Sequence, residues 1–292
     1  MRRFIVAAVV TLATACASHT TPTTNPVPAP GQPPPPPPPP PPPAAGRQTG
    51  LRFGPSALRY VMHQKVDIEQ DVPQGHQQTT YGFSTYFRVT IVGPADSIGY
   101  PMTVTIDSIT SDSGTTVPTN VDISTAKGLT FTGKLTPLGE FVKSVPSDTL
   151  IAQSTAAIVG GFRSFFPRIP AAGVTPGAAW TDTLATNEGG SGTTVRTILQ
   201  SRAPVWEDRN GVRCLRIEAT GTFTMQGSAQ QGGQHIDISG SGVRSGVDYL
   251  AADGRYMGGQ SSDTTNMTLS LRMESVTVPR KQVAQTTVMV LP

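Results

Sequence analysis

Hydrophobic and polar residues alternate with a period of two along much of residues 51–292. Between residues 81 and 91 the odd positions are mostly large and apolar, whereas the even positions are mostly small or polar. This period is typical of a strand that buries one face. The pattern recurs at 102–106, 215–225 and 267–273. The residues predicted to share a buried face are Tyr81, Phe83, Thr85, Phe87, Val89, Ile91, Met102, Val104, Ile106, Leu215, Ile217, Ala219, Phe223, Met225, Met267, Leu269, Leu271 and Met273.

Two dipeptides between predicted strands have the composition of hairpin turns. Asn210-Gly211 separates residues 193–206 from 212–225, and Asp253-Gly254 separates 242–250 from 255–262. Both dipeptides supply the positive φ angles of a two-residue hairpin. Consecutive hairpins predict a meandering antiparallel sheet.

One segment, residues 148–166, has a helical period instead. Asp148 is a suitable N-cap and Pro167 a suitable stop, and the glycine pair at 160–161 weakens the helix by ~1 kcal/mol per glycine. A helix this apolar must pack against the sheet or cover it as a lid. Its predicted face, spaced by three and four residues, comprises Leu150, Ser154, Ala157, Ile158, Gly161, Phe162 and Phe165.

A proline-rich turn follows in FFPRIPAAGVTPGAAWTDTL, residues 165–184, where Gly177-x-x-Trp180-x-Asp182 enters new strands. This arrangement is similar to uncharacterised bacterial envelope lipoproteins, which in turn look like the LolA-like lipoprotein carriers and the mycobacterial LppX-like group. The resemblance covers roughly residues 55–290 through the order of elements. It implies a mainly β fold: a strongly curved antiparallel meander, or half-open barrel, with one main helix packed on the concave side and an apolar cavity between them.

The resemblance suggests that the protein binds an apolar ligand, such as a lipid or acyl chain, in a cavity under the 148–166 helix. A filled core would use the same residues, so a non-catalytic envelope scaffold or protein-interaction module remains the alternative. The expected ligand-binding residues are Phe162, Phe165, Ile158 and Leu150 from the helix and Phe83, Phe87, Leu215, Ile217 and Phe223 from the strands.

The N-terminal residues have the three zones of a secretory signal peptide. Arg2 and Arg3 precede an uncharged run at 4–15, which is shorter than the roughly 20 residues that a membrane-spanning helix needs. Ala13-Thr14-Ala15-Cys16 then resembles the lipobox of bacterial lipoproteins, which implies cleavage before Cys16 and acylation of this residue. Soluble export is the alternative, because Ala13-x-Ala15 also fits a small-x-small cleavage site.

These features predict a signal peptide at 1–15, a lipidated Cys16 with a proline-rich linker at 16–50, and a single β-rich domain at 51–292. Within the linker, the unbroken run from Pro33 to Pro43 favours a polyproline II spacer of roughly 34 Å.

Charge and composition exclude several other classes. The formal net charge of +3 falls to +1 without Arg2 and Arg3, which argues against a nucleic-acid partner. With Cys16 acylated, Cys214 has no disulfide partner and is expected to be inert. The histidines are widely spaced, the sequence has no Gly-x-Ser-x-Gly motif, and no Gly-x-x-x-x-Gly-Lys in it is followed by the Ser or Thr of a phosphate-binding loop. We therefore expect no metal, no cofactor and no enzymatic activity, with an unrecognised hydrolase as the remaining alternative.

The anchor gives the first testable prediction. Ala17, not Asp, follows Cys16, which favours the outer membrane for an envelope lipoprotein. Cys16→Ser should move the protein from the membrane pellet to the soluble periplasm, or leave it unprocessed, because the acyl chains are lost. Fractionation with mass spectrometry of the N-terminus tests this. A wild-type protein that is already soluble, with an unmodified Cys16, would contradict it.

Overall fold

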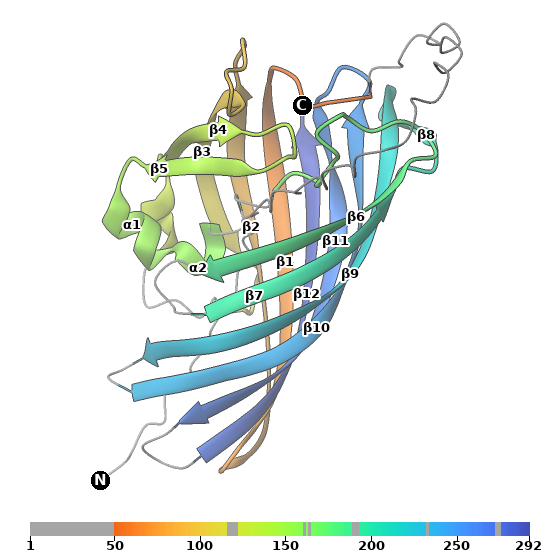
Figure 1. The fold of residues 1–292 in the computed structure, drawn as a ribbon. Helices are drawn as coiled ribbons and strands as arrows, with labels where there is room; N and C mark the ends of the chain where they lie inside the picture. Colours follow the sequence, from red (N-terminus) through yellow and green to blue (C-terminus); the bar gives the residue numbers. More distant parts are fainter. Residues whose placement is uncertain are drawn as a thin grey trace, which may run out of the picture.

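A computed structural model describes residues 50–115, 122–159, 162, 165–188, 193–231, 234–271 and 276–292. The predicted signal peptide, Cys16 and almost all of the predicted linker lie outside these residues. A twelve-stranded antiparallel sheet dominates the structure (Figure 1). Its strands are β1 (Ser56–Val72), β2 (Gly75–Ile91), β3 (Tyr100–Ser111), β4 (Thr130–Leu135), β5 (Phe141–Pro146), β6 (Ala179–Glu188), β7 (Thr193–Arg202), β8 (Trp206–Arg209), β9 (Val212–Gln231), β10 (Gln234–Ala251), β11 (Tyr256–Leu271) and β12 (Val276–Leu291).

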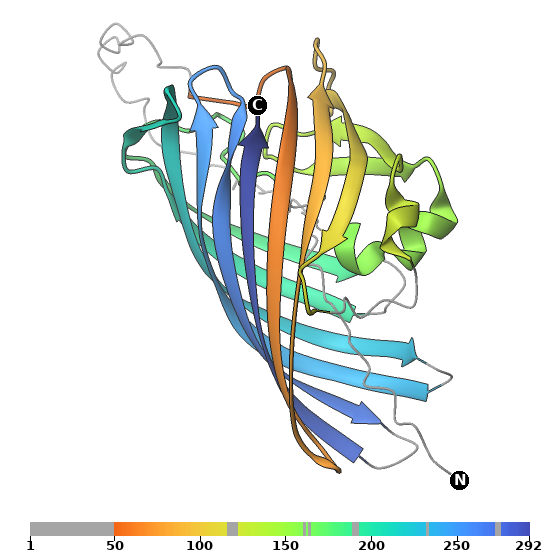
Figure 2. The same ribbon diagram turned by 180° about the vertical axis from the view of Figure 1, so that it is seen from behind.

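The strand order is β5-β4-β3-β2-β1-β12-β11-β10-β9-β7-β6, with β8 paired to β9. The first and last strands therefore pair in the middle of the sheet (Figure 2). From β1 the chain meanders outward to the edge strand β5, crosses to the opposite edge at β6, and returns to β12. The sheet curves strongly and does not close, because β5 and β6 are not paired with each other. The predicted mainly β, half-open fold is confirmed.

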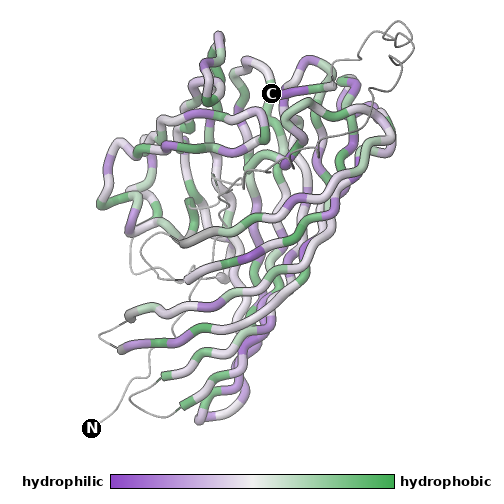
Figure 3. The backbone as a smooth tube through the Cα atoms, viewed as in Figure 1, coloured by the Kyte–Doolittle hydropathy of each residue, from purple (hydrophilic) through white to green (hydrophobic). Residues whose placement is uncertain are grey.

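The predicted alternation of the strands is confirmed where the structure describes them. All six odd positions of 81–91 are buried, as are Met102, Val104 and Ile106. Hydrophobic and hydrophilic stretches alternate along the strands in Figure 3. Most of the inward residues gather in one large apolar cluster on the concave side of the sheet, and a smaller second cluster contains Phe223, Met225, Met267 and Leu269.

The predicted long helix is wrong in its extent. Asp148 caps α1 (Thr149–Ser154) as expected, accepting a hydrogen bond of 3.0 Å from the Ile151 amide. This helix ends at Thr155 after fewer than two turns, and a second short helix follows, α2 (Ala156–Val159). Another short helical turn, η1 (Ile123–Ala126), precedes β4. In the part of the chain that the structure describes, no helix has the length and apolar character needed to cross a membrane.

The two predicted hairpins differ in their turns. Asn210 and Gly211 both have positive φ, 51° and 75°, so the two-residue turn between β8 and β9 is confirmed. At the second hairpin only Gly254 has positive φ, and its amide donates to the Ala251 carbonyl at 2.8 Å. This connection is a three-residue loop that ends in a left-handed glycine, not the predicted two-residue turn.

These glycines provide a matched pair of substitutions. Gly211→Ala should lower the free energy of unfolding by about 1–2 kcal/mol, because the added Cβ meets no atom within 4 Å and only the left-handed backbone is penalised. Gly254→Ala should cost more, because its Cβ would also lie 2.7 Å from the Gly54 amide nitrogen and closer still to the Arg52 carbonyl. Urea unfolding of both variants measures the difference. Equal losses would show that the packing of residues 52–54 against this loop is wrong.

Candidate functional site: a cavity on the concave face

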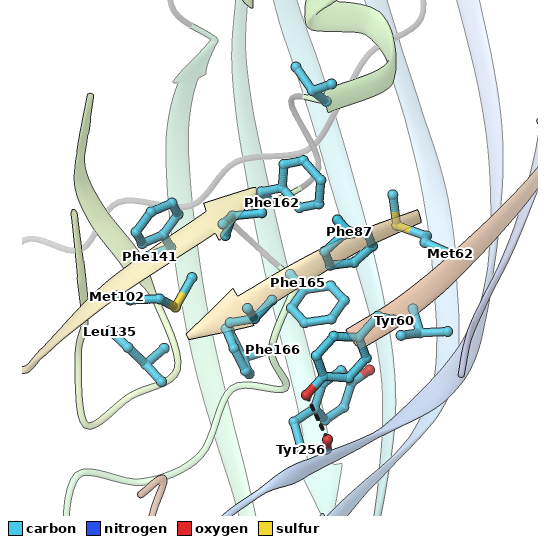
Figure 4. Packing of buried hydrophobic residues seen from close by; sticks show 14 of the residues in the cluster. Tyr60, Met62, Phe87, Met102, Leu135, Phe141, Phe162, Phe165, Phe166 and Tyr256 are labelled. Carbon is cyan, nitrogen blue, oxygen red and sulfur yellow. Dashed lines mark hydrogen bonds between the residues drawn. The ribbon is translucent and has the colours of Figure 1, made fainter. Parts of the chain in front are cut away.

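The chain that crosses from β5 to β6 places three phenylalanines against the concave side of the sheet. We call Phe162, Phe165 and Phe166 the aromatic cluster. The Phe165 ring lies at centroid distances of 5.1 Å from Tyr60, 5.1 Å from Tyr256 and 5.2 Å from Phe87, in each case edge to face (Figure 4). These are favourable aromatic geometries. This part of the concave side is therefore filled by side chains.

Just beyond the aromatic cluster, Arg168 joins the two edges of the sheet. Its Nη1 contacts Oε1 of Glu140, which directly precedes β5. Its Nε and Nη2 contact Oδ2 of Asp182 in β6 at 2.8 and 2.7 Å. The Arg168 and Glu140 side chains are each only 11% exposed. This Arg168 bridge connects the sheet edges where no backbone pairing does.

A cavity of ≈ 210 Å³ lies beside the aromatic cluster and the Arg168 bridge. Its walls come from β1, β2, β6, β7 and β9 to β12, together with the crossing segment. One part of the lining is apolar, and another part carries polar and charged side chains. The charged residues that line it are Glu140, Arg168, Arg244, Asp248 and Asp263.

Four of the predicted ligand-binding residues line this cavity: Phe83, Ile158, Phe165 and Ile217. Phe87, Phe162 and Leu215 belong to the adjoining apolar cluster, where the Phe87 and Phe162 rings lie 4.8 Å apart. The structure thus brings together seven of the nine predicted residues, four of them at the cavity wall.

Leu150 and Phe223 were placed wrongly. Leu150 is 78% exposed, because α1 ends at Ser154 and the helical face that includes Leu150 does not continue to Ile158. Phe223 does lie on the same face of β9 as Ile217, but six residues further along, or about 20 Å in an extended strand. It packs in a second apolar cluster with residues such as Met225, Ile238 and Met267.

The polar part of the cavity contains an ion pair and a hydrogen-bonded chain. Arg244 donates from Nε and Nη2 to the two carboxylate oxygens of Asp263, at 2.7 and 2.6 Å. Tyr256 donates its hydroxyl to Asp248 Oδ1 at 2.7 Å, and Tyr60 donates to the Tyr256 carbonyl at 2.8 Å. Burial raises the pKa of Tyr60 and of Tyr256, so both hydroxyls remain donors at neutral pH.

Asp248 is the carboxylate that this environment perturbs most. Part of its surface faces the cavity, yet the surrounding protein atoms exclude most bulk water. This desolvation raises the pKa of Asp248 from 3.8 to about 6, although the Tyr256 hydroxyl and the Arg244 charge both oppose the rise. Asp248 is therefore mainly ionised at neutral pH, in surroundings that disfavour its charge.

Sequence reasoning missed all the charged residues of the cavity. A signal for them exists in the strand alternation. Asp263 lies an even number of residues from Met267 and Leu269 and therefore shares their inward face of β11. Asp248 shares the inward face of β10 with Leu250 in the same way. A charge at an inward position of a strand is uncommon, and here it marks the site.

The convex face holds the other chemically reactive residues. Cys214 is fully buried beneath Tyr249 and Ala251, and this burial raises the pKa of its thiol, as expected for an inert cysteine. His63 Nδ1 lies 3.1 Å from Ser84 Oγ, and its Nε2 lies 3.7 Å from Asp112 Oδ2. His63, Ser84 and Asp112 do not line the cavity. No group of three metal-ligating side chains occurs among the described residues.

Comparisons with known proteins assign neither a family nor a fold to this chain. No protein-family model and no curated protein matches the chain. A solved structure from Bacteroides fragilis, described as an exported protein with a YmcC-like fold, has 9% sequence identity and a TM-score of 0.25, over 83% of this chain and 100% of that chain. At this TM-score the similarity defines neither a family nor a function. The expected relation to LolA-like and LppX-like carriers stays a prediction.

The Arg168 bridge can be tested by removing its charge. Arg168→Met should lower the free energy of unfolding by roughly 3 kcal/mol or more, because two carboxylates with little exposure lose their partner. Arg202→Met is the control: Arg202 pairs with Glu218 but is 68% exposed, so its loss should cost less than about 1 kcal/mol. Urea unfolding measures both. Similar small losses would mean that the bridge does not hold the sheet edges together.

Proposed function

We propose that this protein is a non-catalytic envelope lipoprotein whose β domain binds an apolar or amphiphilic small molecule in the concave cavity. One observation carries the proposal. The cavity lies between the curved sheet and the crossing segment, and Phe83, Ile158, Phe165 and Ile217 form part of its wall. A concave space with apolar walls and a few convergent polar groups is typical of a small-molecule site.

The size of the cavity limits the ligand. A volume of ≈ 210 Å³ lies below the roughly 300–1,000 Å³ of most ligand pockets. The proposed occupant is therefore a single short alkyl chain or a compact molecule. Of the lipid or acyl ligand expected from sequence, the cavity would hold one chain.

The aromatic cluster favours the second candidate function, an envelope scaffold or protein-interaction module. Phe165 and Phe166 pack edge to face at 4.9 Å and fill the space between Tyr256 and Phe53. That region behaves as a packed core and not as a lid over an empty sheet. The two candidates therefore differ in whether the adjoining cavity takes a ligand.

In this proposal, acylated Cys16 anchors the protein and the proline-rich linker separates the β domain from the membrane, which we propose to be the outer membrane. Two or three acyl chains would make this anchor stable, at ~0.8 kcal/mol for each buried CH₂. The partners are then the membrane, through the anchor, and the small molecule in the cavity.

Filling the cavity tests ligand binding. Ala219 lines the cavity, whereas Ala185 in β6 is exposed. Ala219→Leu should weaken binding of the uncharged probe 1-octanol by at least tenfold, because the larger isobutyl side chain occupies the space, and Ala185→Leu should leave it unchanged. Isothermal titration calorimetry on the full chain carrying Cys16→Ser, which needs no detergent, measures the affinities. Mass spectrometry of organic extracts identifies any ligand that copurifies.

Binding that is not saturable, together with extracts free of bound small molecules, would contradict the cavity proposal and favour the scaffold. Equal weakening by both leucine variants would place the octanol site elsewhere. Thermal melts establish that each variant is folded before its affinity is compared.

A further inference from the structure

The Asp248 carboxylate has fewer donors than its chemistry can use. A carboxylate has two oxygens and about four acceptor positions. Among the described residues, the Tyr256 hydroxyl on Oδ1 is its hydrogen-bond donor. Gly259 lies opposite Asp248 on β11, and a Cβ there would overlap Asp248 Oδ1. The carboxylate fits here because residue 259 has no side chain. Its Oδ2 atom can therefore accept a hydrogen bond from a ligand.

The charge balance of the cavity favours a cation over an anion. Its lining carries two arginines and three carboxylates. Arg244 is held by both oxygens of Asp263, and Arg168 is held by Glu140 and by Asp182. An anionic ligand would have to compete with these carboxylates for either arginine. A cationic ligand would meet Asp248, which pairs with neither arginine at ion-pair distance.

The surroundings of Asp248 also suit an alkyl ammonium. The Tyr256, Phe165 and Phe166 rings line the same cavity, and aromatic rings attract cations in sites with little water. Phe83 and Ile217 provide apolar wall for a chain. A charged amine paired with a carboxylate in low dielectric makes a strong hydrogen bond.

We infer that Asp248 determines the specificity of the cavity, which takes a small amphiphile with a cationic amine head bound at the Asp248 carboxylate and its alkyl part against Phe83 and Ile217. This inference rests on the proposed function, because it requires that the cavity bind a ligand. It narrows the ligand from an apolar molecule to an alkyl amine, and it disfavours free fatty acids.

Three probes of equal chain length separate the head group from the chain: octylammonium, 1-octanol and octanoate. Calorimetry at pH 7.5 on the full chain with Cys16→Ser should show octylammonium binding at least tenfold more tightly than either of the others. Asp248→Asn keeps the size of the side chain and an acceptor for Tyr256, and it should abolish this preference because the amide carries no charge. Asp107→Asn, where Asp107 pairs with Arg59 and Arg88 on the convex side, is the matched control and should retain the preference.

A pH series on the same protein gives a second readout that needs no substitution at Asp248. Octylammonium stays charged at both pH 7.5 and pH 5, whereas Asp248 becomes mainly protonated below its pKa of about 6. The affinity for octylammonium should therefore fall by about tenfold at pH 5, and octanol binding should not change. The other charged or titratable groups that line this cavity are Tyr256, Arg244, Asp263, Arg168 and Glu140, and Tyr60 donates to the Tyr256 carbonyl. Among the described residues, no histidine lines the cavity.

The outcomes distinguish this inference from the proposed function. If none of the three probes binds saturably, the cavity is not a ligand site and both fail. If octanol or octanoate binds as tightly as octylammonium, or if Asp248→Asn keeps the preference in a folded protein, the cavity binds ligands but Asp248 does not select an amine. A tenfold preference that is lost both in Asp248→Asn and at pH 5 supports the inference.

Discussion

The pairing of β1 with β12 in the middle of the sheet determines how the rest of the chain must run. Because the two end strands are neighbours, the strands between them have to reach both edges, and the chain must cross from β5 to β6. On the way Val174 forms an isolated bridge with Leu51. The crossing segment passes over the concave side, where a dozen strands present their apolar face. The segment therefore has to be apolar itself, and this requirement explains the position of Phe165-Phe166-Pro167 in the sequence.

The crossing segment also replaces the backbone pairing that would close a barrel. An open sheet leaves two edges whose backbone groups need partners. Arg168 contacts side chains from both edge regions, and the Ile169 amide donates to the Leu138 carbonyl at 3.2 Å. Side-chain contacts of this kind hold two edges at a distance that strand pairing would not allow. The concave cavity lies beside this bridge, where side chains do not fill the space enclosed by the curved sheet.

Much of the sheet was predictable from local patterns, because an inward strand residue is recognised by its neighbours two positions away. The 81–91 strand and the Asn210-Gly211 turn are examples. The broken helix was not predictable, because the spacing from Leu150 to Phe165 assumes one continuous helix and nothing in the period reveals that the chain restarts after Thr155. Phe223 shows another limit: alternation gives the face of a residue but not its position along a long, curved strand.

The charged residues of the cavity were missed because strand assignment weights the apolar members of a face and treats the others as exceptions. In the structure these charged residues line the same cavity. Asp248, Asp263 and Arg244 come from two adjacent strands, and Glu140 and Arg168 approach from the opposite edge. Burying charges costs stability even when they are paired, and apolar residues of similar volume often replace such pairs without loss. A domain that served only as a scaffold would gain stability by filling the cavity with apolar side chains. Here the costly charges and the unfilled volume occur at the same place, and this coincidence is typical of a binding site, where local stability is lower than the sequence could achieve.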